Sequence, residues 1–226
     1  MNFGQQVLNY HFQLKPTLKL TAGVEWLMPY NHPQTRKSME TFYGTFYNDD
    51  HSRVFILGIN PGRFGAGLTG VPFTDPIRLE KLGIKNDFPK KQELSSVFVY
   101  EMIEQCGSPE DFFSKYYIAS LSPLGLTKNG VNYNYYDDPK LAKQIEPFII
   151  HNIETQRAFG CDNEVVYCLG QGKNFDYLSK LNDRHQWWKK VIPLPHPRWI
   201  MQYRLKRKEE FIKQYQALFC PYASTC

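Results

Sequence analysis

Four short apolar runs, each closed by a loop, constrain the fold of this chain more than any other feature. The closing loops are rich in Gly, Pro, Asn, Ser and His, so each run is bounded as a buried strand would be. Apolar runs without polar alternation are typical of strands covered on both faces, as in a parallel sheet. The predicted strands are Arg53–Ile59, Tyr116–Leu121, Glu164–Leu169 and Lys190–Leu194.

Helical patterns separate these strands, and no obvious hairpin joins them. This alternation predicts a three-layer α/β/α fold with a central parallel sheet of about four strands. We expect one domain over residues 1–226, with a helical N-terminal segment, residues 1–50, packed on it. The predicted helices are Gly4–Leu14, Gln34–Asn48, Ser95–Gln105, Pro139–Phe159, Lys173–Asn182 and Lys206–Phe219.

The carboxyl ends of parallel strands meet at one edge of the sheet, where open α/β folds bind their ligands. The loops at that edge would bring together Asn60, Ser120, Gly170 and His196. We therefore expect the chemistry of the protein to lie where these four residues meet.

Basic residues gather near the C-terminus, although the net charge is only +5. Residues 184–213 hold nine Lys or Arg and two acidic residues, whereas the rest of the chain is slightly acidic. This asymmetry is expected of a surface that faces a polyanion, and a solvated helix face is the alternative.

The five cysteines are odd in number and scattered, and they form no C-x-x-C pair. This usage favours reduced thiols in the cytoplasm over a disulfide scaffold, and it offers no recurring ligand spacing for a metal. The N-terminus lacks the features of a secretory signal, and no stretch approaches the length of a membrane span. We expect a soluble, cytoplasmic protein with no membrane partner.

The loop that follows the first strand is rich in glycine and almost free of charge. Neither G-x-G-x-x-G nor G-x-x-x-x-G-K-[ST] occurs in it, so dinucleotide and P-loop sites fail on spacing. A tight loop with the Asn60 amide at its mouth and Phe64 and Phe73 nearby could hold a planar heterocycle. The alternative is a structural loop in which Asn60 caps a turn and both rings belong to the core.

Three segments carry a resemblance to a known family. Residues 58–73, GINPGRFGAGLTGVPF, resemble the first motif of the uracil-DNA glycosylase superfamily in its single-strand-selective monofunctional form, roughly G-M-N-P-G-P-F-G-x-x-x-T-G-V-P-F. YYIASLSPLG, residues 116–125, resembles the second strand of that family, and LPHPRW, residues 194–199, resembles its last motif, H-P-S-P-R-N. The resemblance covers residues 53–203. It implies a monofunctional DNA glycosylase that flips out uracil and removes it hydrolytically in base-excision repair, with no cofactor and no metal.

The resemblance also assigns roles to individual residues. Asn60 matches the residue that positions the attacking water, and His196 matches the donor that stabilises the departing uracil anion. Phe73 matches the ring on which the flipped base stacks, and Phe64 matches a pocket wall. The matched motifs contain no lysine nucleophile, so base release without strand cleavage is expected.

Two positions loosen the choice of substrate. Ser120 stands where the family has a base-reading Asn, and Asn132 or Asn134 from the next loop could fill in. Related enzymes with a G-Q-D-P-Y-H motif have a bulky Tyr at the position of Gly62. Gly62 and the small Ala66 therefore predict room beside C5 of the base, and with it acceptance of 5-hydroxymethyluracil.

The residues after His196 could contact DNA. The last motif is shorter than in the family, and Arg198, Trp199, Ile200 and Met201 could form a wedge that fills the space of the flipped nucleotide. Burial of Trp199 and Ile200 against the last helix is the alternative. Phosphate contacts are expected from Arg198, Arg204, Lys206, Arg207 and Lys208.

Other functions stay open at this point. The chain could be a damage-binding protein with weak glycosylase activity, or a glycosylase acting on deaminated purines, because Ser120 departs from the family pattern. It could also be a nucleoside- or nucleotide-processing enzyme that uses the same pocket. For the DNA glycosylase we expect a monomer that takes single- or double-stranded DNA with a damaged base.

Overall fold

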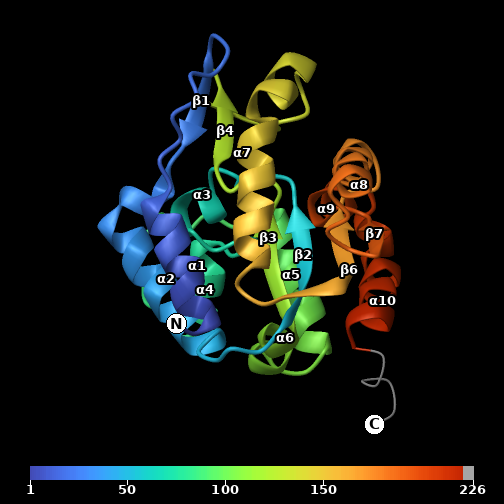
Figure 1. Cartoon of the computed structure of the whole chain (residues 1–226). Helices are drawn as coiled ribbons and strands as arrows, with labels where there is room; N and C mark the ends of the chain where they lie inside the picture. The colour runs from blue at the N-terminus through green and yellow to red at the C-terminus, as the bar shows by residue number, and fades with distance from the viewer. Residues whose placement is uncertain (221–226) are drawn as a thin grey trace.

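The computed structural model describes residues 1–220, and a four-stranded parallel sheet forms its centre (Figure 1). The strands follow the order β3–β2–β6–β7, and each neighbouring pair is parallel. Their bounds are β2 Arg53–Gly58, β3 Tyr116–Ser120, β6 Cys161–Leu169 and β7 Lys190–Leu194. The four predicted strands are confirmed, and only β6 begins earlier than expected.

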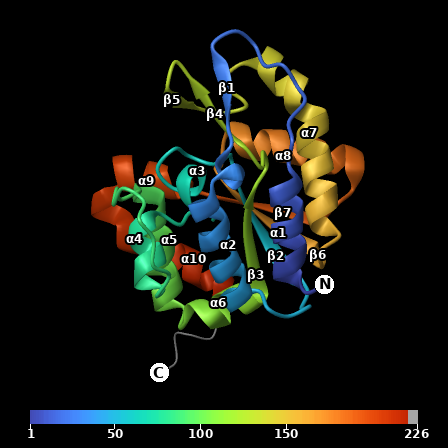
Figure 2. The same cartoon turned by 90° about the vertical axis from the view of Figure 1, so that its left-hand side faces the viewer.

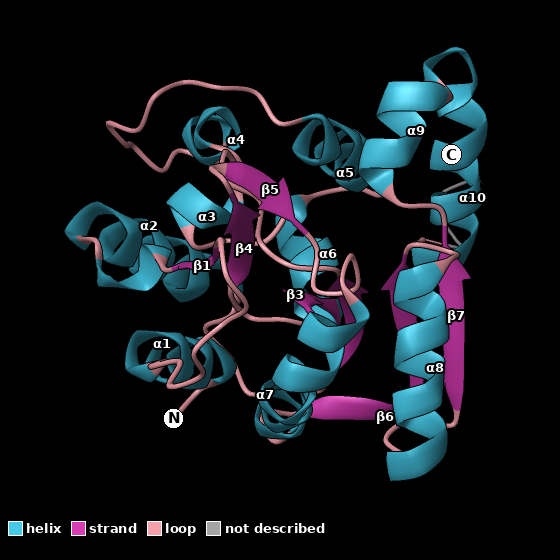
Figure 3. Cartoon of the chain, turned by 90° about the horizontal axis from the view of Figure 1, so that it is seen from above, coloured by secondary structure: helices cyan, strands magenta, loops and turns pink. Residues whose placement is uncertain are grey.

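Helices cover both faces of this sheet, which confirms the predicted three-layer architecture. Two helices, α5 and α10, lie on one face, and α7 and α8 lie on the other (Figures 2 and 3). Their bounds are α5 Leu94–Gln105, α7 Pro139–Arg157, α8 Lys173–His185 and α10 Lys208–Phe219. Three shorter helices lie between β2 and β3, namely α3 Ala66–Thr69, α4 Pro76–Lys81 and α6 Pro109–Lys115. A fourth, α9 Pro197–Tyr203, lies between β7 and α10.

The N-terminal segment contains the two expected helices, α1 (Phe3–Gln13) and α2 (Pro33–Phe46). Phe3 of α1 packs its ring against Tyr47 and Tyr117, with centroids 5.7 and 5.0 Å apart. Since Tyr117 belongs to β3, this contact joins the first helix to the central sheet. Phe3 and Phe219 share one hydrophobic core.

A second, antiparallel sheet differs from the sequence prediction. It pairs β1 (Val24–Leu27) with β4 (Gly125–Lys128), and β4 with β5 (Val131–Tyr133). The β4–β5 hairpin turns at Asn129 and Gly130, whose φ angles are 51° and 72°. An Asn-Gly pair favours such turns because both central residues need positive φ. The expectation of a chain without hairpins is therefore wrong at this point.

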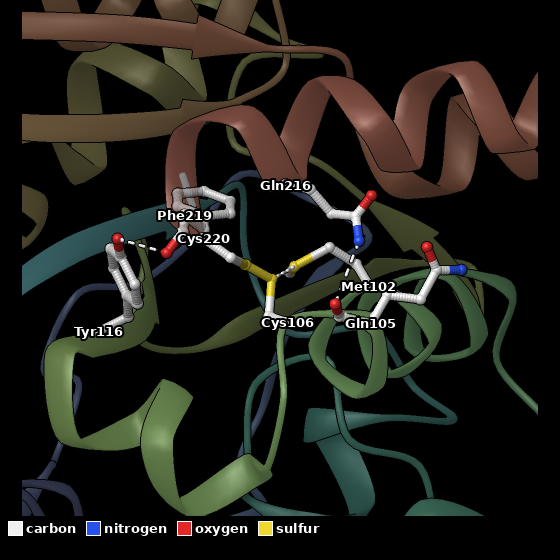
Figure 4. Close-up of a disulfide and its surroundings, with 7 residues drawn as sticks. All are labelled: Met102, Gln105, Cys106, Tyr116, Gln216, Phe219 and Cys220. Carbon is white, nitrogen blue, oxygen red and sulfur yellow. Dashed lines mark hydrogen bonds between the residues drawn. A yellow bond between two sulfur atoms is a disulfide. The ribbon is translucent and has the colours of Figure 1, made fainter. Parts of the chain in front are cut away.

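A disulfide between Cys106 and Cys220 also differs from the prediction of reduced thiols (Figure 4). It joins the ends of α5 and α10, which lie on the same face of the sheet. Two hydrogen bonds, both 3.1 Å long, lie near this disulfide. The Tyr116 hydroxyl donates to the Phe219 carbonyl, and the Gln216 amide donates to the Gln105 carbonyl. The packing of two helices distant in sequence brings these thiols together, and spacing in the sequence could not reveal that. Cys161 and Cys168 are free, and Cys226 lies outside the described residues.

Candidate active site

A cavity of about 420 Å³ opens at the carboxyl edge of the central sheet. The expected residues Asn60, Ser120 and His196 line it together, and they follow or end β2, β3 and β7. Gly170 lies instead on an adjoining cavity of about 300 Å³, which shares His196 and Trp199 with the first. Strand β5 and helix α9 flank this edge in the view from above (Figure 3).

Asn60 presents an unpaired amide oxygen. Its Nδ2 donates to the Tyr133 carbonyl at 3.2 Å, which fixes the direction of the amide. Its Oδ1 is buried and has no hydrogen-bond partner among the described residues. A buried acceptor without a partner carries a desolvation cost of about 1–3 kcal/mol. The amide is therefore arranged to accept a hydrogen bond from a molecule that enters the cavity.

His196 is a neutral imidazole of fixed tautomer. Its Nδ1 accepts a hydrogen bond from the Arg198 backbone N–H at 3.1 Å, where it caps the first turn of α9. The proton of the neutral ring must then sit on Nε2. Burial, assisted by the positive charge of Arg198, lowers the pKa of His196 to about 4. The ring is thus a neutral Nε2–H donor at neutral pH.

Phe73 lines the cavity beside His196, with ring centroids 5.8 Å apart. Its φ is 53°, a left-handed conformation that is rare for a bulky residue. Gly58 packs against the same ring, because a Cβ at Gly58 would lie 2.8 Å from Phe73 Cε2. The fold therefore holds this ring at the cavity at a cost in backbone strain.

Gly62, Ala66 and Asn132 also line the cavity, but the space beside Gly62 is not empty. A Cβ at Gly62 would lie 3.1 Å from Glu93 Oε1 and 3.6 Å from Asn132 Nδ2. The structure thus places a carboxyl group and an amide group where the glycine predicted open room. The oxygen of Asn132 accepts a hydrogen bond from the Arg63 backbone N–H at 3.1 Å.

Ser120 and Phe64 differ in their place relative to the cavity. Ser120 is buried and lines it, and the half-buried Asn134, one of two possible substitutes for the missing Asn, lines it too. Phe64 does not line this cavity but a neighbouring groove, and the ammonium of Lys91 lies 3.7 Å from its ring centroid. This groove shares Glu93, Asn132 and Arg198 with the cavity, so a role of Phe64 beside the base stays a prediction.

The residues expected to contact DNA lie at different distances from the mouth of the cavity. Arg198 and Trp199 line it, whereas Ile200 is fully buried and cannot act as part of a wedge. Trp199 remains 39% exposed, and the Arg204 guanidinium lies 4.8 Å from its ring centroid. Farther out, Arg207 forms an ion pair with Glu210 at 2.8 Å. Lys206 is exposed and forms no ion pair within the described part of the chain.

Sequence reasoning missed several residues of the cavity, above all Glu93. No motif marks it, because it follows the polar stretch Lys90-Lys91-Gln92 and has the sequence context of a surface residue. The other cavity residues not foreseen are Ser95, Tyr136, Gln202 and Tyr203.

Neither a metal site nor a membrane span is found in residues 1–220. The described residues contain no group of three or more His, Cys, Asp or Glu side chains that could hold a metal ion. None of the described helices is long and apolar enough to cross a membrane.

Fold and cavity together define an α/β protein with a site at the carboxyl edge of a parallel sheet, where an amide oxygen, a neutral imidazole and an aromatic ring meet. The family model of the uracil DNA glycosylase superfamily matches residues 45–219. The crystal structure of wild-type Pedobacter heparinus SMUG2 superposes with a TM-score of 0.94 and 44% sequence identity, over 97% of each chain. No curated protein matches the chain. The chain belongs to the uracil DNA glycosylase superfamily and is a DNA N-glycosylase.

Proposed function

We propose that this enzyme removes uracil from DNA with Asn60 and His196 as its catalytic residues. The observation that carries the proposal is their complementary arrangement in one cavity. Among residues 1–220, the oxygen of Asn60 is buried and has no hydrogen-bond partner, and the neutral ring of His196 has an N–H with no acceptor.

The two groups suit a hydrolysis in which the glycosidic bond breaks early. Asn60 cannot act as a strong base, so its oxygen orients a water molecule toward the sugar carbon while the bond to the base opens. The electron pair of that bond leaves with the base, and the Nε2–H of His196 donates to the developing anion. A preorganised donor of this kind contributes about 3–4 kcal/mol to transition-state stabilisation.

The ring of Phe73 supplies the stacking surface for the extruded base. Its face and the polar groups around it match the needs of a flipped pyrimidine, which is held by stacking and by hydrogen bonds at its edge. Ser120 and Asn132 provide those edge contacts, and Gly62 and Ala66 bound the space beside the base. We expect 5-hydroxymethyluracil to be accepted as well, through the polar groups next to Gly62.

DNA lies across the mouth of the cavity in this proposal. Arg198 and Trp199 contact the flipped nucleotide and its neighbours, and Arg204, Lys206 and Arg207 contact flanking phosphates. The exposed fractions of Trp199 and Tyr203, 39% and 65%, leave aromatic surface for stacking on bases. The enzyme would act as a monomer in the cytoplasm.

A preference for deaminated purines is the second candidate. It is favoured by Ser120, since a hydroxyl can rotate to donate or accept and therefore discriminates less sharply between base edges than an amide. A nucleoside- or nucleotide-processing activity is not favoured, because the chain belongs to a superfamily of DNA glycosylases.

The variants Asn60→Ala and His196→Ala test the proposed roles in single-turnover assays with uracil-containing oligonucleotides. Each variant should lose about 10²–10³-fold in rate while its affinity for abasic DNA stays close to that of the wild type. Rates within threefold of the wild type would contradict the assignment.

A further inference from the structure

The backbone of Glu93 is fixed at the start of α5 by a buried carboxylate. The Glu93 N–H donates to Asp75 Oδ2 at 2.9 Å. Asp75 itself is fully buried and caps α4 by accepting from the Arg78 N–H at 2.8 Å. Glu93 is therefore held by two helix starts rather than by a mobile loop.

The carboxyl group of Glu93 packs against two glycines, Gly62 and Gly65. A Cβ at Gly65 would lie 1.9 Å from its Oε2, and a Cβ at Gly62 would lie 3.1 Å from its Oε1. Any side chain at Gly65 would push the carboxyl group out of the cavity. The glycine-rich loop thus makes room for Glu93.

This carboxyl group has no partner of its own. Within residues 1–220 it forms neither a hydrogen bond nor an ion pair, although it lines the cavity together with Asn132 and Arg198. Burial raises the pKa of Glu93 to about 7; the charge of Arg198 opposes this rise, and Asp75 adds to it. Glu93 is half-buried, and a partly desolvated carboxyl group without a donor is free to accept a hydrogen bond from a molecule that enters the cavity.

We propose that Glu93 is a specificity-determining residue, whose carboxylate accepts a hydrogen bond from an N–H or O–H donor on the base edge that lies against Gly62. The proposal rests on the proposed function, because it needs a base in this cavity. A site built to pair with such a donor disfavours bases that lack it, since the carboxylate then stays unpaired. A methyl group at this place, as in thymine, would face the carboxylate without compensation.

The test compares the wild type with Glu93→Leu, Glu93→Gln and the control Glu104→Gln, an exposed glutamate on the same helix. Single-turnover rates are measured on oligonucleotides with uracil, 5-hydroxymethyluracil, hypoxanthine or xanthine. The 5-hydroxymethyluracil/uracil pair probes an exocyclic hydroxyl donor, and the xanthine/hypoxanthine pair probes a ring N–H donor. Thermal unfolding checks that every variant is folded.

In Glu93→Leu we expect the donor-bearing base of at least one pair to lose tenfold or more in rate relative to the other base of that pair. Glu93→Gln keeps an acceptor oxygen and should fall between Leu and the wild type, and Glu104→Gln should match the wild type. Ratios unchanged in Glu93→Leu, or equal losses on all four bases, would overturn the role of Glu93 and leave the proposed function standing. A wild type that releases none of the four bases would overturn both.

Discussion

The unpaired carboxyl group of Glu93 predicts an unusual dependence of stability on pH. The ordinary pKa of a glutamate is 4.5, and burial raises that of Glu93 to about 7. The native state therefore binds this proton more tightly than the unfolded state does. Below about pH 4.5 the group is protonated in both states and costs nothing. As the pH rises from 4.5 to 7 it destabilises the native state progressively.

The size of the effect follows from the same values. Each tenfold difference in proton affinity is worth about 1.4 kcal/mol, so the full cost at pH 8 is about 3 kcal/mol. Solvent at the cavity mouth screens part of this cost, and we expect about 1–3 kcal/mol. Glu93→Gln removes the titration and should be more stable than the wild type by about this amount at pH 8 relative to pH 4.5.

Urea unfolding of both proteins between pH 4.5 and 8 measures this difference directly. The charges that act on Glu93, those of Asp75 and Arg198, are common to both proteins and largely cancel, as does the titration of His196 in the same cavity. Glu104→Gln serves as the control and should follow the wild type at every pH. Parallel stability curves for the wild type and Glu93→Gln would refute the reasoning.

Three further predictions concern other parts of the molecule. In binding titrations at several salt concentrations, Lys206→Ala should reduce the slope of log K against log salt by about 0.9. Arg207→Ala should reduce this slope by less, because Arg207 is paired with Glu210. Equal slopes for the two variants would contradict this. Gly130→Ala places a Cβ at a φ of 72° and should destabilise the protein by about 1 kcal/mol. It should also slow base release, because the β4–β5 hairpin carries Asn132. An unchanged midpoint in thermal unfolding would count against this prediction. Thiol titration of the unfolded, non-reduced protein should find two fewer free thiols than titration after reduction, because Cys106 and Cys220 are joined. Equal counts would show that this disulfide does not form.

Much of the fold could be predicted because its strands are continuous apolar runs that end at Gly, Pro or Asn. Such runs need no partner to be recognised, and Arg53–Gly58 and Lys190–Leu194 stand almost where the sequence puts them. The antiparallel sheet was missed because its strands are only three or four residues long and their pairing joins Val24–Leu27 to residues a hundred positions later. The Asn129-Gly130 turn was the one local signal available.

The site divides in the same way. Asn60, Phe73 and His196 lie in ordered motifs next to strand ends, so their meeting at one cavity follows from the parallel sheet. Glu93 reaches the cavity only because Asp75 fixes the start of α5 against the glycine-rich loop. That contact depends on tertiary packing and leaves no trace in local sequence. Phe64 differs from Glu93 because it does lie in a motif. Its place in that motif did not predict the direction of its ring.

The most direct test of the central claim is a product analysis of the wild-type enzyme acting on an oligonucleotide with a single uracil. The account predicts that free uracil is released and that the strand stays intact until alkali cleaves it at the abasic site. His196→Ala and Asn60→Ala should reduce this release by about 10²–10³-fold. Absence of free uracil, or strand cleavage without alkali, would contradict the account.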